Sequence, residues 1–184
     1  PPWQRRAVLF SLHIGIRTKN TALDFANDPE TVVLKKAQAN LSQISTYMYR
    51  LSSQQILKVL LALIQENSQE GRGAIIVFCN LRQTSKELEL RLKLNHIKAK
   101  HISAADPNSE RRAFFLEFAK IENEADKSQL VLIVSNDNLS VLPSKFASLA
   151  IHYDIPLDPD IYLERVRIMR PKVSTIIGLV CERY

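Results

Sequence analysis

The chain has 184 residues, of which 46% are hydrophobic and 24% are charged, and its formal net charge is +6. These values are typical of one globular domain with a buried core and a fragment of another, and no apolar run approaches the length of a membrane span. Two cysteines are too few for a disulfide framework or a zinc site, so we expect Cys79 and Cys181 to be buried, reduced thiols of a cytosolic or nuclear protein.

The excess of positive charge is compatible with an anionic partner such as nucleic acid, although many basic domains bind none. The chain begins at Pro1, which is not a natural start, so we expect it to be part of a longer protein.

Residues 1–42 carry the weaker structural patterns. Arg6–Phe10 predicts a short strand, and a segment of mixed helical character follows it. Phe25–Pro29 is typical of a turn, Thr31–Leu34 is a β-branched run, and Lys35–Ser42 has the composition of a polar linker.

Stronger patterns begin at residue 44. Ile44–Arg50 alternates in polarity as a strand does, and Ser52 with Gln55 forms a capping box that predicts a helix over Ser53–Asn67. The remaining expected elements are strands at Ala74–Cys79, Ile97–Ile102, Leu130–Val134, Ala147–Tyr153 and Val173–Cys181, and helices that open at a Thr84 and Glu87 capping box, at Asp106-Pro107 and at Asp158-Pro159.

Strands and helices that alternate with short connections predict an α/β fold. We expect a mostly parallel sheet with helices on both faces, joined by right-handed crossovers. Such sheets bind their ligands at the carboxyl ends of the strands. The polar turn Ser135-Asn136-Asp137-Asn138, which follows a continuous apolar run, is therefore the expected place for binding chemistry.

The order and spacing of these segments resemble the second RecA-like domain of DEAD-box RNA helicases. Ala74–Thr84 is similar to the family's "vIIFvnT" strand and turn, and Tyr153-Asp154-Ile155-Pro156 followed by Tyr162 matches its "Y-D-x-P……Y" pattern. Ser11-Leu12-His13 stands where the family has Ser-Ala-Thr, and Phe25–Pro29 matches its F-x-x-D-P. The resemblance implies a three-layer RecA-like domain over residues 41–184, preceded at 1–40 by the tail of a first RecA-like domain and a linker.

Three motifs of that family are altered here. Its His-Gly-Asp-x-x-Gln-x-x-Arg is replaced over Ser103–Arg111, which keeps only the arginine. Its Thr-Asp-x-x-x-Arg-Gly-x-Asp is replaced over Ser135–Pro143, which lacks the arginine, the glycine and the ribose-binding aspartate. Its His-Arg-x-Gly-Arg-x-Gly-Arg becomes Glu164–Pro171, where Arg165 stays in register and Ile168 and Pro171 occupy the two finger positions.

The altered finger positions bear on catalysis. An arginine finger stabilises charge on the transferring phosphoryl group and contributes roughly 10³ to 10⁵ in rate. Ile168 and Pro171 offer no cation, while Arg167 and Arg170 lie one position early, about 100° around a helix. We therefore expect no catalytic residue and no nucleotide cofactor, and hence a domain that is not an enzyme. We also expect no metal site, because His96, His101 and Cys79 show no ligand spacing.

The resemblance also implies contacts with single-stranded RNA, at Asn80, Arg82, Asn108, Arg111, Ser135, Asn136 and Arg165. Two of these positions have alternatives: Ser135-Asn136 is equally well a polar turn that ends a strand, and Arg111 an exposed charge in the first turn of a helix. The basic stretch from Arg91 to Lys100 is expected to be solvated charge, and Phe114 and Phe118 are expected to pack in the core.

Our hypothesis from the sequence is a non-catalytic helicase-like domain that binds RNA, or mediates self-association or binding to other proteins, within a larger scaffold and away from membranes. The resemblance extends to the Yb group of Tudor-containing, helicase-like proteins, which implies binding of piRNA precursors in cytoplasmic granules. The alternative is the second domain of a working ATP-dependent RNA helicase, which would need a phosphate-binding Gly-Lys-Thr loop in an upstream domain. A third hypothesis is a small-molecule enzyme with the same α/β fold, but the sequence offers no nucleophile, metal-ligand set or glycine-rich loop to support it.

Overall fold

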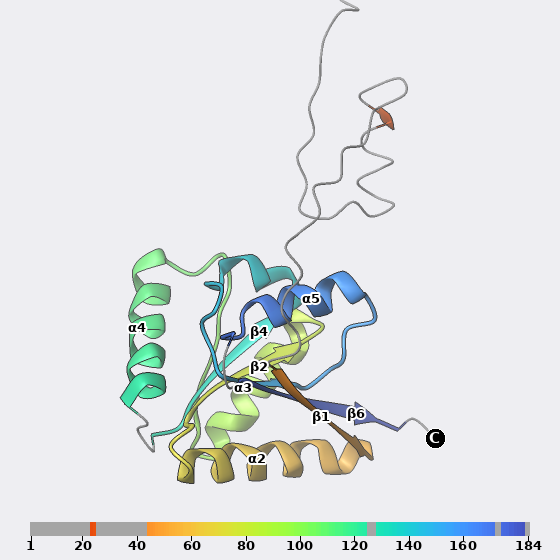
Figure 1. Cartoon of the computed structure of the whole chain (residues 1–184), viewed down its shortest axis with the longest axis vertical. Coiled ribbons are helices and arrows are strands. Elements are labelled where there is room, and N and C mark those ends of the chain that lie inside the picture. Colours follow the sequence, from red (N-terminus) through yellow and green to blue (C-terminus); the bar gives the residue numbers. More distant parts are fainter. Residues whose placement is uncertain (1–22, 25–43, 125–127, 172–173, 183–184) are drawn as a thin grey trace, which may run out of the picture. The chain divides into compact units, whose positions relative to one another are not determined.

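The computed structural model describes residues 23–24, 44–124, 128–171 and 174–182 (Figure 1). The chain divides into two units, Pro1–Gln38 and Ala39–Tyr184, and the sheet belongs to the second. The elements expected before residue 44 lie outside the described residues, except for Leu23 and Asp24, which are helical.

Strands and helices alternate along the second unit. They are β1 (Ile44–Leu51), α2 (Ser53–Gln69), β2 (Ala74–Cys79), α3 (Arg82–Leu94), β3 (Lys98–His101), α4 (Asn108–Glu124), β4 (Leu130–Ser135), the short 3-10 helix η2 (Asn136–Val141), β5 (Leu149–His152), α5 (Pro159–Arg167) and β6 (Ser174–Cys181). The six strands form one sheet in the order β1-β6-β5-β2-β4-β3, and every pair is parallel. The predicted three-layer α/β fold is confirmed, and the sheet is parallel throughout.

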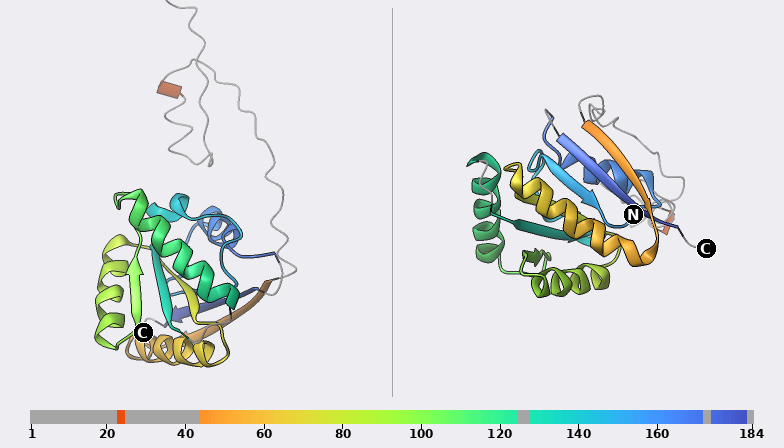
Figure 2. Two further views of the ribbon diagram at one scale, coloured as in Figure 1. Left: turned by 90° about the vertical axis from the view of Figure 1, so that its left-hand side faces the viewer. Right: turned by 90° about the horizontal axis from the view of Figure 1, so that it is seen from below.

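Helices cover both faces of this sheet (Figure 2). One core lies under α2 and α3 and includes Leu60, Leu88 and Leu92, while the other lies under α4 and α5 and includes Phe118 and Ile168. Strands β2 and β4 are buried at every position, which is why their sequences are continuous apolar runs rather than alternating ones.

Two predicted helix starts are confirmed. Ser52 and Gln55 form the capping box that opens α2. Asp158 caps α5, because its Oδ1 atom accepts a hydrogen bond from the N–H of Asp160 at 2.8 Å, and Pro159 follows at the first helical position.

Two other predicted helix starts are wrong. Helix α3 begins at Arg82, before Thr84, and the Glu87 carboxylate accepts a hydrogen bond from Gln83 instead of closing a capping box. Helix α4 begins at Asn108, because the Asp106 carboxylate accepts from the N–H of Ser103 and so closes a turn rather than capping the helix.

The two cysteines differ in environment. Cys79 is buried in β2, and burial raises the pKa of its thiol to about 12, so this thiol is inert at neutral pH. Cys181 is exposed because it is the last residue of β6, at the rim of the sheet, and the prediction that both thiols are buried is wrong for this one. Across the part of the chain described here, no helix is both long and apolar enough to cross a membrane.

Candidate nucleic-acid interface

The carboxyl ends of β2, β4 and β5 meet at one edge of the sheet, which is where parallel α/β proteins place their ligand loops. Asn80 directly follows β2, Asn136 directly follows β4, and Asp154 is the second residue after β5. The side chain of Arg165 reaches into this edge from α5 and is fully buried.

Arg165 joins the three strand ends through its guanidinium group. Its Nη2 atom donates to Oδ1 of Asn136 at 2.7 Å and to Oδ1 of Asn80 at 2.8 Å, and its Nε atom lies 3.2 Å from the same Asn136 oxygen. Its Nη1 atom donates to the backbone carbonyl of Asp154 at 2.7 Å. One cation therefore fixes loops that are separated by as many as 85 residues in the sequence.

Asn80 connects the same loops a second time. Its backbone N–H donates to Oδ2 of Asp154 at 3.2 Å, and its side-chain Nδ2 donates to the carbonyl of Ile155 at 3.0 Å. The Nδ2 atom of Asn136 lies 3.4 Å from Oδ1 of Asn80. Asn80, Asn136 and Arg165 thus form one polar network, which we call the Arg165 network, at the carboxyl edge.

The Arg165 guanidinium sits beneath the protein surface without a paired carboxylate. Among the described residues, none of its hydrogen-bond acceptors is a carboxylate oxygen. The guanidinium carbon lies 5.3 Å from the centre of the Phe78 ring, a cation–π contact. Burial lowers the pKa of Arg165 to about 10, against an opposing effect from Cys79 and Asp154, so the side chain is still charged at neutral pH.

Replacing Asn136 with aspartate places a carboxylate in direct hydrogen-bonding contact with Arg165. We expect Asn136→Asp to raise the free energy of unfolding at pH 7 by about 1 to 2 kcal/mol, because a charge-assisted hydrogen bond is stronger than a neutral one. Urea unfolding measures the change. Gln65→Glu adds the same charge at an exposed position of α2 and should change stability by only a few tenths of a kcal/mol; equal effects of the two substitutions would show that a carboxylate in direct contact with Arg165 brings no particular stabilisation.

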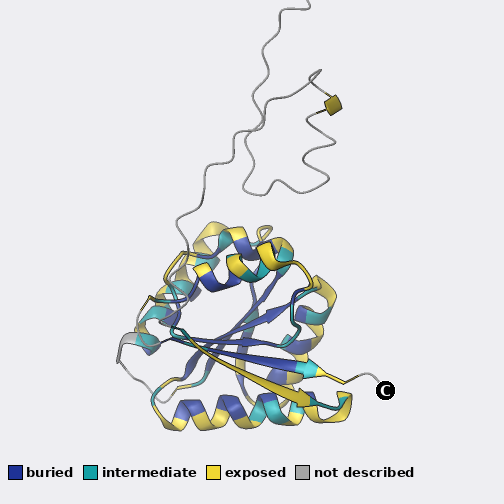
Figure 3. Ribbon diagram, turned by 45° about the vertical axis from the view of Figure 1, so that its right-hand side comes forward, coloured by how far each residue is buried: buried dark blue, intermediate teal, exposed yellow. Residues whose placement is uncertain are grey.

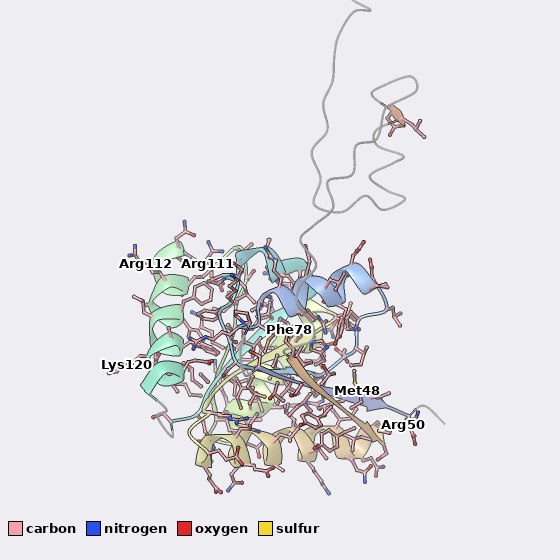
Figure 4. The ribbon with its side chains drawn as sticks, in the orientation of Figure 1. Met48, Arg50, Phe78, Arg111, Arg112 and Lys120 are labelled. Atoms are coloured by element: carbon pink, nitrogen blue, oxygen red, sulfur yellow. The ribbon has the colours of Figure 1, made fainter. Side chains whose placement is uncertain are left out.

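A second group of polar residues lies near the start of α4. Nη2 of Arg82 donates to Oγ of Ser103 at 3.0 Å, and Oδ1 of Asn108 accepts from Arg111. Arg111 and Arg112 project from one end of α4 (Figure 4). A shallow hollow of about 400 Å³ is formed here by Asn108, Arg111, Arg112, Phe115, Ser140 and Val141.

Ser135 ends β4 and is fully buried. Its hydroxyl donates to the Asp137 carboxylate and accepts from Nδ2 of Asn138 at 2.9 Å. The hydroxyl is therefore engaged in closing the turn after the strand, which is the alternative role considered for it from the sequence.

The structure thus places the seven sequence-predicted residues in separate surroundings. Asn80, Asn136 and Arg165 contact one another, and Asn108 contacts Arg111. Arg82 binds Ser103, and Ser135 is confined to its turn. Contact between RNA and any of the seven stays a prediction.

Two residues near this edge were missed in the sequence. The Asn138 side chain is buried and accepts from the N–H of Ala104 at 2.8 Å, tying the loop after β3 to η2. Arg112 lines the hollow beside Arg111, and its position directly after that residue near the start of a helix was a usable signal. Asn138 carried no signal beyond its place in a polar turn.

Two lysines of the basic stretch between Arg91 and Lys100 form ion pairs with glutamates. Nζ of Lys98 lies 2.5 Å from Glu117, and Nζ of Lys100 lies 3.3 Å from Glu110, both on α4. Exposed pairs of this kind contribute little to stability, but they reduce the charge available to an anionic ligand. The described residues contain no group of three or more histidine, cysteine, aspartate or glutamate side chains arranged to hold a metal ion.

Comparison with known proteins identifies relatives at low sequence identity, and no family model matches the chain. The ATP-dependent RNA helicase RhlB of Xanthomonas axonopodis pv. citri is 24% identical over 186 aligned positions, which cover 98% of this chain and 30% of the helicase. RhlB of Aeromonas salmonicida is 25% identical, with 100% of this chain and 41% of the helicase covered. The chain spans less than half the length of these curated relatives.

Solved structures agree on the fold. S. cerevisiae Dbp5 bound to RNA and ADP BeF3 superposes with a TM-score of 0.64 at 20% identity, covering 95% of this chain and 44% of that one. A DEAD box protein from the hyperthermophile Methanococcus jannaschii gives a TM-score of 0.58 at 20% identity, with coverage of 95% and 45%.

Proposed function

We propose that the chain is a helicase-like domain, related to the C-terminal RecA-like domain of DEAD-box RNA helicases, that is non-catalytic and binds single-stranded RNA within a larger protein. The RNA-binding part of this proposal is carried by the cations of the α4 hollow, defined above by Asn108, Arg111, Arg112, Phe115, Ser140 and Val141. The hollow lies at the edge of the sheet formed by the carboxyl ends of the strands, because its lining residues belong to the start of α4, which follows β3, and to η2, which follows β4.

The α4 hollow offers the chemistry that an RNA backbone requires. Arg111 and Arg112 present two guanidinium groups among the first five residues of a 17-residue helix, near the end whose backbone N–H groups also favour an anion. Arginine binds phosphate oxygens in a bidentate manner, and phosphate contacts supply most of the affinity of sequence-independent binding. Phe115 contacts Phe146 with ring centres 5.4 Å apart, so the helix that carries these cations is anchored to the core.

The surroundings of the finger positions support the absence of catalysis. Ile168 is fully buried, and Pro171 has neither a cation nor a backbone N–H. Nε of Arg170 lies 3.9 Å from Oε1 of Glu122, and Arg165 is committed to its network. Arg167 ends α5 as an exposed residue.

Binding to a fluorescein-labelled oligouridine of about 12 nucleotides tests the RNA site. We expect Arg111→Ala combined with Arg112→Ala to weaken binding by roughly tenfold or more and to reduce the dependence of log K on log salt by about 1 to 2. Fluorescence anisotropy across salt concentrations measures both quantities. Lys120→Ala, further along the same helix (Figure 4), is the matched control, and a double variant that binds as tightly as this control would refute the assigned site.

We propose further, on the resemblance to Yb-type proteins, that the RNA is a piRNA precursor and that the whole protein self-associates in cytoplasmic granules. Crosslinking of the whole protein to RNA in cells, followed by sequencing, tests the first part. The location of the tagged protein tests the second.

A further inference from the structure

Strand β1 forms an open edge of the sheet. It pairs only with β6, and within the described ranges no strand lies on its other side. Its eight residues include no proline and no acidic residue, and its one charged residue is Arg50. An edge strand of this length presents a row of unpaired backbone N–H and C=O groups that can pair with another chain. Figure 3 shows β1 as mostly exposed beside the buried strand β6.

One face of β1 is aromatic and lines a hollow. Tyr47 and Tyr49, which are 56% and 43% exposed, form one wall of a hollow of about 350 Å³ between β1 and α2. Thr175 and Ile177 of β6 also line it. Met48 points to the opposite face of the sheet, where it packs over Gly178, so the two tyrosines share one side of the strand.

The opposite wall of the hollow is acidic. Glu66 and Glu70 lie one turn apart at the carboxyl end of α2, and both are exposed. No described cation forms an ion pair with either of them, including the nearby Arg72, and the last turn of α2 contains no basic residue. Because the carboxyl end of a helix already carries partial negative charge, these carboxylates favour a cation from outside the domain.

We propose that this edge binds an extended, lysine- or arginine-containing segment of a partner protein, which adds to the sheet as a further strand beside β1. Backbone hydrogen bonds to β1 would supply affinity, and alternate side chains would supply specificity. Residues two apart in a strand lie about 6.8 Å apart on one face, which is close to the spacing of one helical turn between Glu66 and Glu70. Two basic residues at such positions meet both the carboxylates and the faces of Tyr47 and Tyr49.

Charge favours a basic partner over a second copy of this chain. Self-pairing of β1 about a twofold axis brings the acidic pair of each copy to one interface, and like charges there oppose association. The chain as a whole carries a net charge of +6, so a basic peptide has no general attraction to it. Binding of such a peptide must therefore arise at a local acidic site.

The test uses the whole chain and a fluorescein-labelled peptide of about ten residues in which valine and lysine alternate. One control peptide replaces every lysine with glutamate, and another carries N-methyl groups on alternate valines to block strand pairing. We expect the lysine peptide to bind and both control peptides to bind roughly tenfold more weakly or worse. RNA that fills the α4 hollow is expected to leave this binding unchanged, so failure of the proposed RNA function does not affect the outcome.

Two double variants locate the binding. Glu66→Gln with Glu70→Gln, and Tyr47→Ser with Tyr49→Ser, should each weaken the lysine peptide by roughly tenfold or more. Glu87→Gln with Glu110→Gln removes two carboxylates elsewhere and should have no effect. Thermal unfolding establishes that each variant is folded.

The proposal is overturned by any of three results: no binding of the lysine peptide, equal binding of the lysine and glutamate peptides, or full affinity in the Glu66 and Glu70 double variant. Sedimentation of the chain without peptide tests whether a second copy of the chain occupies this edge instead. A concentration-dependent dimer that the tyrosine double variant dissolves would assign the edge to self-association and would also overturn the proposal.

Discussion

Replacing Arg165 with methionine is expected to lower the free energy of unfolding by about 2 to 4 kcal/mol, because several charge-assisted hydrogen bonds are lost together. Methionine retains an apolar stem but removes every donor, so the side-chain oxygens of Asn80 and Asn136 and the carbonyl of Asp154 lose this partner in a partly buried site. Three loops at the carboxyl edge then lack their common connection. Urea unfolding followed by circular dichroism measures the loss.

Arg167→Met is the matched control for this substitution. Arg167 lies two residues later in the same helix and is exposed, so its replacement should change stability by no more than about 0.5 kcal/mol. Arg165→Lys should recover only part of the loss, because an ammonium group cannot reproduce the planar fork of the guanidinium. Equal stability of Arg165→Met and Arg167→Met would show that the Arg165 network does not hold the edge together.

The unfolding free energy is expected to fall by about 3 kcal/mol between pH 6.5 and pH 4 because of His152 alone. This imidazole is fully buried between Phe78 and Tyr162, with both ring centres 5.4 Å away, and neither of its nitrogens has a hydrogen-bond partner. Burial, reinforced by the charge of Arg165, lowers the pKa of His152 from 6.5 to about 3.

The direction of this pH dependence follows from the pKa of His152 in the unfolded chain, 6.5, and in the folded chain, about 3. Below pH 6.5 the histidine of the unfolded chain takes up a proton, whereas the folded one stays neutral until about pH 3, so acid favours unfolding throughout this window. His152→Leu should remove this part of the pH dependence and leave the variant more stable than the wild type at pH 4. His96→Asn, at an exposed position, should keep the wild-type profile. An unchanged profile in His152→Leu would contradict the assignment.

The sheet was predictable because its strands are buried on both faces. Runs such as Ala74–Cys79 and Leu130–Val134 show the continuous apolar character that this environment requires, and their boundaries are recovered to within one residue. Helix starts were predictable where the cap residue pairs forward, with a residue of the helix that it opens. Ser52 and Asp158 pair with residues two or three positions later in the chain, whereas Asp106 pairs with Ser103, three positions earlier, in the turn after β3.

The candidate site was less predictable because its contacts are distant in sequence. Nothing near Arg165 indicates that it is buried, since its partners lie in loops that follow β2, β4 and β5. Its neighbours Arg167 and Arg170 have the same residue type and different surroundings, one exposed and one beside Glu122. A sequence shows which charges exist, but only the fold determines which of them are paired.

ATP hydrolysis by the full-length protein, with and without single-stranded RNA, tests the central proposal most directly. On the proposal that Ile168 and Pro171 stand at the two finger positions, we expect no RNA-stimulated phosphate release above the protein-free background, and no effect of Arg167→Ala or Arg170→Ala on that level. RNA-stimulated hydrolysis that either substitution abolishes would contradict it and would establish the domain as half of a working helicase.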